Sequence, residues 1–158
     1  MSVKDFVQQR RDVLIAMRRD FHMYPEPAWL EYRSAAKVAD TLISLGYDVA
    51  LGADVLDLES RMGLPSDEVM KAAMDRAIKE GANPELVEKM GYGKTAIVAT
   101  MKFGGEGPVV AFRVDMDSND VIEAKEDNHV PTKGGCRSCH DKAMHACGHD
   151  AHMTMGLG

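Results

Sequence analysis

The fold class is decided by residues 95–114, Thr-Ala-Ile-Val-Ala-Thr-Met-Lys-Phe-Gly-Gly-Glu-Gly-Pro-Val-Val-Ala-Phe-Arg-Val. Residues 95–101 are β-branched and apolar, and residues 108–114 are apolar almost without interruption up to Arg113. Such a run is typical of a strand that is covered on both faces in an α/β sheet. The glycine-rich turn 104–107 is short enough for the two strands to pair as a hairpin. The stretch therefore predicts an α/β fold.

Two helices and a short strand are predicted upstream of this hairpin. Apolar residues recur at the helical period between Phe6 and Phe21. This helix should end near Tyr24-Pro25, because the residue before a proline avoids helical angles. A second helix is predicted over residues 34–45, and a short strand over residues 47–51.

A helical insertion is predicted over residues 60–91, before the strands. Ser66 can cap a helix over residues 67–80, and Pro84 stands at the first position of the next helix. Residues 153–158 have the pattern of a helix opening. Because the sequence stops there, we expect an incomplete domain, the N-terminal portion of a larger protein.

The composition excludes several classes of function. The 158 residues are 45% hydrophobic and carry a net charge of −6, without a basic block, which argues against nucleic-acid binding. No run of about 18 apolar residues predicts a membrane span. No signal-peptide core precedes the first helix, so a cytoplasmic location is expected. The three cysteines lie among five of the six histidines, which favours metal or thiol chemistry over disulfides.

The segment His145-Ala-Cys-Gly-His-Asp-Ala-His152 contains most of these groups. In an extended loop alternate residues point the same way, so His145, Cys147 and His149 could face one pocket. Thiolate and imidazole are good ligands for zinc and related divalent ions. Asp150 could bind the far nitrogen of a histidine and fix its tautomer. The alternative is a surface loop without metal, and the spacing favours the metal.

Two further groups of residues stand near predicted element ends. Asp115 and Asp117 follow the apolar strand 108–114, where ligands collect in open α/β sheets. They could orient a metal-bound group, although residue chemistry alone favours a solvated loop. His22 is predicted to close the first helix, where an imidazolium favours the negative end of the helix dipole. A structural role is the favoured interpretation of His22.

The segment Cys136-Arg-Ser-Cys139-His140 has the C-x-x-C-H pattern of c-type haem attachment. Attachment of that kind normally needs an export signal, which the sequence lacks. A local zinc site using Cys136, Cys139 and two later ligands is a second possibility. An unliganded loop is favoured over both. A small metal- or haem-binding module based on Cys136, Cys139 and His140 remains the alternative function.

Three separated segments resemble one family, the dinuclear-metal amidohydrolases related to aminoacylase, hippurate hydrolase and auxin-conjugate hydrolases. The insertion is similar to that of the hydrolases that act on p-aminobenzoyl-glutamate. The matching segments are 19–22 with Pro25-Glu26 and Glu31, then 111–117, and then 144–152, which is the most specific.

The resemblance implies a helix-flanked, mixed-sheet metallopeptidase-type catalytic domain that binds two divalent metals, Mn or Zn. Cys147 and His149 match its first two metal ligands, and Asp115 matches an aspartate that orders the site. The other ligands and the general-base glutamate would lie outside this chain, as would a lid domain used for dimerisation. The implied activity is amide hydrolysis of N-acyl or N-aroyl amino acids, including p-aminobenzoyl-glutamate in folate catabolism. The chain alone is expected to be inactive.

The sequence also departs from the family. Ser118-Asn119 stands where relatives usually have Ala-Leu, and Cys136 and Cys139 are not part of the metal motif. The resemblance implies homo- or hetero-oligomers of the whole protein. It implies small-molecule substrates and neither a nucleic acid nor a membrane as partner.

Overall fold

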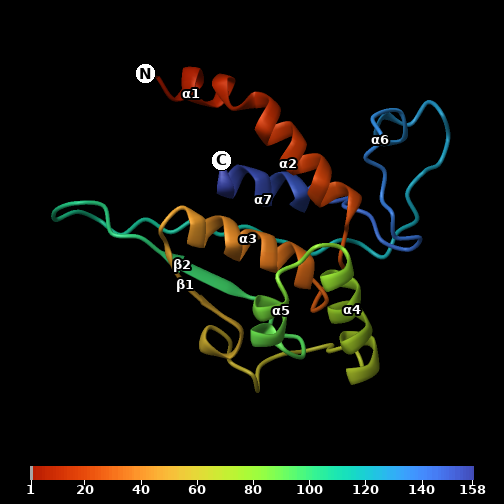
Figure 1. Ribbon diagram of the computed structural model, residues 1–158, viewed down its shortest axis with the longest axis horizontal. Helices are drawn as coiled ribbons and strands as arrows, with labels where there is room; N and C mark the ends of the chain where they lie inside the picture. Colours follow the sequence, from red (N-terminus) through yellow and green to blue (C-terminus); the bar gives the residue numbers. More distant parts are fainter. Residues whose placement is uncertain (1) are drawn as a thin grey trace. The chain divides into compact units, whose positions relative to one another are not determined.

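Helix α2 (Arg11–Met23) packs against helix α7 (His149–Leu157), although the two come from opposite ends of the chain (Figure 1). The computed structural model describes residues 2–158, which divide into two units. The first unit consists of residues up to Pro27 together with residues 113–158. Its other helices are α1 (Val3–Gln9) and α6 (Val130–Lys133). Phe21 of α2 and Met153 of α7 are buried in this unit.

The first predicted helix is present, but it is divided. Arg10 ends α1 and precedes α2, and its φ and ψ of −95° and 2° interrupt the regular helix. Ser2 caps α1 by accepting a hydrogen bond from the Asp5 backbone N–H at 3.2 Å. Helix α2 ends at Met23, directly before Tyr24-Pro25, as the proline predicts.

The second unit, residues 28–112, is built around helix α3 (Tyr32–Ser44). Strands β1 (Asp48–Leu51) and β2 (Ile97–Thr100) form an antiparallel pair in which Asp48 lies opposite Thr100. The 3₁₀ turn Gly52–Asp54, helix α4 (Asp67–Lys79) and helix α5 (Pro84–Met90) complete the unit. The core residues of these elements include Tyr32, Ala35, Ala36, Ala39, Met70, Ala73, Ala77, Val87 and Met90.

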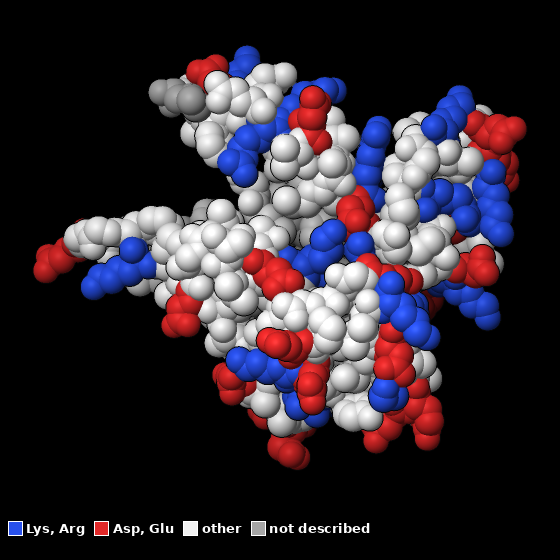
Figure 2. Space-filling view, viewed as in Figure 1, with Lys and Arg blue, Asp and Glu red and all other residues white. Residues whose placement is uncertain are grey.

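The two helices predicted over residues 67–80 and from Pro84 are present, as α4 and α5. Ser66 accepts a hydrogen bond from the Val69 N–H at the start of α4, and Pro84 is the first residue of α5. Asn83 caps α5 through the Glu85 N–H at 3.1 Å. The outer surface of α4 and α5 has acidic and basic side chains interspersed (Figure 2). This mixed surface agrees with the absence of a basic block from the sequence.

The predicted strand over residues 108–114 is wrong. The structure assigns no strand there, and Val109 and Phe112 are 97% and 88% exposed. Strand β2 instead pairs with β1, so the predicted hairpin does not form. A strand covered on both faces needs neighbours for its backbone groups and its side chains, and residues 2–158 supply none to this segment. None of the helices in residues 2–158 is both long and apolar enough to cross a membrane.

A buried tyrosine joins two parts of the second unit and gives a test of its packing. The Tyr32 side chain is fully buried, and its hydroxyl accepts a hydrogen bond from the Gly93 N–H at 2.9 Å. We expect Tyr32→Phe to lower the free energy of unfolding by about 1–3 kcal/mol, because the buried N–H loses its acceptor. Urea unfolding followed by circular dichroism measures the change. Tyr92→Phe, at a half-exposed position, is the control, and equal losses in both variants would contradict the expectation.

Candidate metal centre

Three side chains of the first unit, Asp115, His149 and His152, bring potential metal-ligand atoms within 4.8 Å of one another. His149 and His152 lie one turn apart on α7, and their rings stack with centroids 5.1 Å apart. Asp115 reaches them from the segment that follows Arg113, to which its carboxylate is paired. Two imidazoles and one carboxylate form a donor set that suits zinc or manganese. The donor chemistry therefore fits a divalent metal.

The ring of His149 is oriented by the acidic loop. Its Nδ1 is 2.8 Å from the Asp117 carbonyl oxygen and 3.1 Å from Asp117 Oδ1. Both partners are acceptors, so Nδ1 carries the proton and Nε2 remains available to a metal. An oxygen that holds the far nitrogen of a ligand histidine is the usual arrangement at metal sites. Asp117 thus has the role that the sequence interpretation gave to Asp150.

The motif around Cys147 does not follow the alternation expected of an extended loop. Helix α7 begins at His149, after Gly148 in the left-handed conformation with a φ of 84°. His145 is buried, with neither ring nitrogen hydrogen-bonded to any of residues 2–158, whereas Cys147 is exposed. The Cys147 backbone N–H donates to Asn119 Oδ1 at 3.1 Å. The structure brings His149 to Asp115 and His152, and leaves Cys147 outside that group.

A network of buried ion pairs involves Asp150, the residue after His149, and the sequence did not predict it. Asp150, the second residue of α7, accepts hydrogen bonds from His22 Nδ1 at 2.7 Å and from Arg18 Nε at 2.9 Å. His22 Nε2 is 3.0 Å from Glu123 Oε1, which also accepts from His129 Nε2 at 2.8 Å. No sequence pattern links these residues, because they come from α2, α7 and the loop between β2 and α7.

The network shifts the pKa values of its members in opposite directions. The hydrogen bond to Asp150 raises the pKa of His22 above its ordinary value, against the effect of burial. Burial alone would raise the pKa of Asp150, but His22 and Arg18 hold it below its ordinary value. Burial likewise opposes the lowered pKa of Glu123, which the hydrogen bonds from His129 and His22 maintain. The charged form of each group is therefore favoured.

His145 differs from His22, although both rings are buried. Burial lowers the pKa of His145 to about 4, so its ring is neutral near pH 7. Its two ring nitrogens have no partner among residues 2–158, whereas both nitrogens of His22 face carboxylates. The difference in charge between the two rings therefore follows from their hydrogen-bond partners.

Comparison with known proteins reveals relatives that match nearly the whole chain. The chain is 45% identical over 157 residues to a p-aminobenzoyl-glutamate hydrolase from Escherichia coli (strain K12), covering 99% of the chain and 36% of that protein. It is 43% identical over 156 residues to indole-3-acetyl-aspartic acid hydrolase of Enterobacter agglomerans, covering 99% of the chain and 36% of that protein.

Over 99% of its length the chain is thus similar to proteins named as hydrolases of amino-acid conjugates. A crystal structure of an aminobenzoyl-glutamate utilization protein from Klebsiella pneumoniae matches the chain with a TM-score of 0.78 and 36% identity. The match covers 99% of the chain and 33% of the solved protein. The chain thus spans about a third of the length of these relatives. A scan against models of protein families finds no match.

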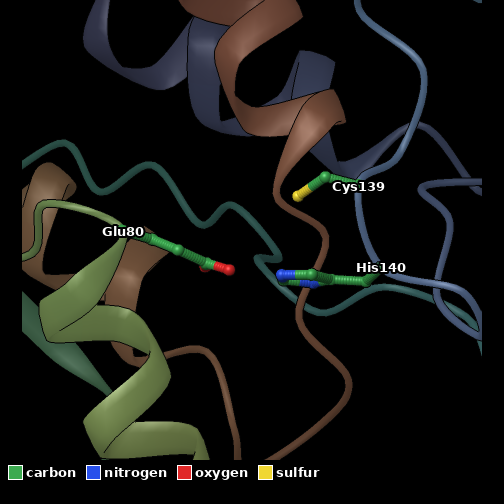
Figure 3. A group of neighbouring side chains, drawn as sticks. All are labelled: Glu80, Cys139 and His140. Atoms are coloured by element: carbon green, nitrogen blue, oxygen red, sulfur yellow. The ribbon is translucent and has the colours of Figure 1, made fainter.

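The relatives and the structure disfavour a haem module in this chain. Cys139 and His140 project side by side from the loop between α6 and α7 (Figure 3), whereas Cys136 is buried. His140 Nδ1 donates to the Pro25 carbonyl oxygen at 2.7 Å, and the Cys139 N–H donates to the Met23 carbonyl oxygen at 2.9 Å. These bonds fix the loop to the end of α2. Glu80, also drawn in Figure 3, belongs to the second unit.

Proposed function

We propose that the chain provides one part of a metal-dependent centre that hydrolyses the amide bond of N-acyl or N-aroyl amino acids. The observation that carries the proposal is the convergence of Asp115, His149 and His152 in a chain whose relatives are named as hydrolases of amino-acid conjugates. p-Aminobenzoyl-glutamate is the favoured substrate, because one of these relatives is named for its hydrolysis. The whole protein would then act in folate catabolism, in the cytoplasm, as an oligomer.

Each residue has a defined role in this proposal. His149 binds a divalent metal through Nε2 while Asp117 holds its Nδ1–H. His152 and Asp115 would be further donors of the same centre, and the exposed Cys147 thiol would be another ligand. Asp115 also orients the site. The centre holds two divalent ions, Mn or Zn, in the whole protein, and residues outside 1–158 supply the general-base glutamate.

A bound divalent cation would polarise the amide carbonyl and lower the pKa of a water molecule. The contribution of this chain is the fixed geometry of its donors. Asp117 holds the His149 ring through Nδ1, and Asp115 supplies negative charge that would offset the charge of a cation. Because donors beyond these residues are required for turnover, the chain alone should hydrolyse p-aminobenzoyl-glutamate negligibly.

Cobalt titration of the purified chain tests the proposal. Co²⁺ reports thiolate and imidazole ligation through its visible and near-ultraviolet absorption. We expect Cys147→Ala and His149→Ala each to weaken binding by more than about 100-fold, beyond the 10–100-fold typical of residues that only support a ligand. The thiolate band should disappear with Cys147→Ala.

Cys139→Ala is the matched control, because Cys139 is also an exposed cysteine outside any disulfide. Its affinity for Co²⁺ should remain within about threefold of the unsubstituted chain. Loss of binding with Cys139→Ala but not with Cys147→Ala would reject the proposed centre and favour the Cys136–His140 segment.

A further inference from the structure

His22 lies between two carboxylates, and this fixes its charge state by geometry. Its Nδ1 is 2.7 Å from Asp150 Oδ2, and its Nε2 is 3.0 Å from Glu123 Oε1. The residue is only 2% exposed, so water cannot supply a missing proton donor. A neutral imidazole has one N–H, whereas two ionised acceptors require two. His22 is therefore an imidazolium.

The groups that face His22 balance its charge. Arg18 and His22 are the cations, and Asp150 and Glu123 are the anions. His129 also donates to Glu123 at 2.8 Å, which a neutral ring can do. The neutral His145 ring is a further titratable neighbour. A balanced set of buried charges is sensitive to the loss of any one member.

The imidazolium acts on the part of α7 that carries His149. Asp150 follows His149 directly, and its Oδ1 accepts a hydrogen bond from the Ala151 N–H at 2.8 Å. Its carbonyl oxygen accepts from Thr154 Oγ1 at 2.8 Å. Gly148, which precedes the helix, provides no side-chain cap. The position of the first turn of α7 is therefore fixed through the Asp150 side chain.

We propose that His22 is a positioning residue of the metal centre: as an imidazolium held by Asp150 and Glu123, it fixes the first turn of α7 and thereby His149. The effect of His22 on metal binding rests on the proposed function, whereas its effect on the position of the first turn of α7 does not. It adds to the helix-dipole role predicted from the sequence, since His22 does lie in the last turn of α2. The ion pairs of this network also link α2 to α7. Because they are directional, they define the relative position of the two helices more closely than apolar contacts alone.

The same substitution at two histidines of the network separates positioning from general stability. In His22→Gln the amide can donate to one carboxylate, but its oxygen must then face the other. In His129→Gln the amide can replace the single N–H that reaches Glu123. The first variant should disturb α7, and the second should not.

Three measurements on the purified chain test the inference. Nitrogen-15 NMR of the unsubstituted chain without metal should show protons on both ring nitrogens of His22 at pH 7. Amide hydrogen exchange of Ala151 and His152, which donate to the Gly148 carbonyl oxygen, should accelerate about tenfold or more in His22→Gln. It should change by less than about threefold in His129→Gln, while α3 amides remain unchanged in both. Co²⁺ affinity should fall 10–100-fold in His22→Gln alone.

The outcomes are distinct for the two proposals. An unprotonated nitrogen on His22, or equal exchange in the two glutamine variants, overturns the positioning role. If the unsubstituted chain binds no Co²⁺, the proposed function fails. The ring protonation and the metal-free exchange rates then still decide whether His22 fixes the turn. Unchanged Co²⁺ affinity in His22→Gln, with intact binding by the unsubstituted chain, also overturns the role.

Discussion

Replacement of Asp150 by alanine is expected to lower the free energy of unfolding by about 3–5 kcal/mol. The Asp150 side chain is fully buried and accepts from both His22 and Arg18. Its removal leaves the buried His22 imidazolium with one carboxylate fewer, and Arg18, which is 43% exposed, turns to solvent at little cost. The loss therefore arises mainly at His22. Urea unfolding followed by circular dichroism measures the change.

Asp12→Ala is the control for this substitution. Asp12 pairs with Arg11 at 3.2 Å on the surface of α2, where an ion pair contributes little. Its unfolding midpoint should stay unchanged. The loss of free energy of unfolding in Asp150→Asn should lie between the losses in Asp12→Ala and Asp150→Ala. The amide oxygen can still accept one hydrogen bond, but the negative charge is absent. A loss in Asp150→Ala no larger than in Asp12→Ala would show that the network does not stabilise the fold.

The stability of the metal-free chain should be highest near pH 6.5. Below that pH the buried His145 ring, whose pKa burial lowers to about 4, causes a loss of stability because the unfolded chain takes up this proton first. The raised pKa of His22 means that its contribution is complete below its ordinary value of 6.5 and is lost as pH rises through the folded value. The lowered pKa values of Asp150 and Glu123 mean that their contributions are complete above 3.8 and 4.5 and are lost as pH falls through the folded values. Deprotonation of His22 should therefore lower the stability as pH rises above 6.5.

Thermal unfolding measured across this pH range tests the linkage. In His22→Gln the alkaline decline should be absent, because the titrating ring is gone, while the acid decline remains. In His129→Gln both declines should remain. Parallel alkaline declines in the unsubstituted chain and in His22→Gln would assign the effect to another group.

Local signals explain which parts of the fold were predictable. Ser66, Pro84 and Pro25 act on their own backbone neighbours, and each element end that they predicted is present. The strand predicted over residues 108–114 is absent, because a strand is stable only when it pairs with a neighbouring strand, and the described residues provide none. The division at Arg10 has no composition signal, since both sides continue the same apolar period.

The sequence predicted two members of the group, His149 and Asp115, but neither His152 as a donor nor the connections between the residues. The spacing of His149 and His152 was visible in the sequence, and the strand-end position of Asp115 was noted, but their convergence depends on tertiary packing. The pairing of His22 with Asp150 joins residues from opposite ends of the chain. Asp117 and Asp150 could not be told apart as partners of His149 without coordinates. Histidines near helix ends and aspartates beside metal motifs are both common, and most of them form no pair like that of His22 with Asp150. Their presence in the sequence therefore did not predict this pair.

The first unit is assembled from the two ends of the sequence, whereas the second is one continuous segment. During synthesis residues 28–112 can therefore fold while the ribosome is still adding the residues that follow. Helix α2 is made before residues 28–112, yet the carboxylate that Asp150 offers to His22 is absent until α7 has emerged. Helix α2 is consequently made before the second unit but reaches its native contacts after it.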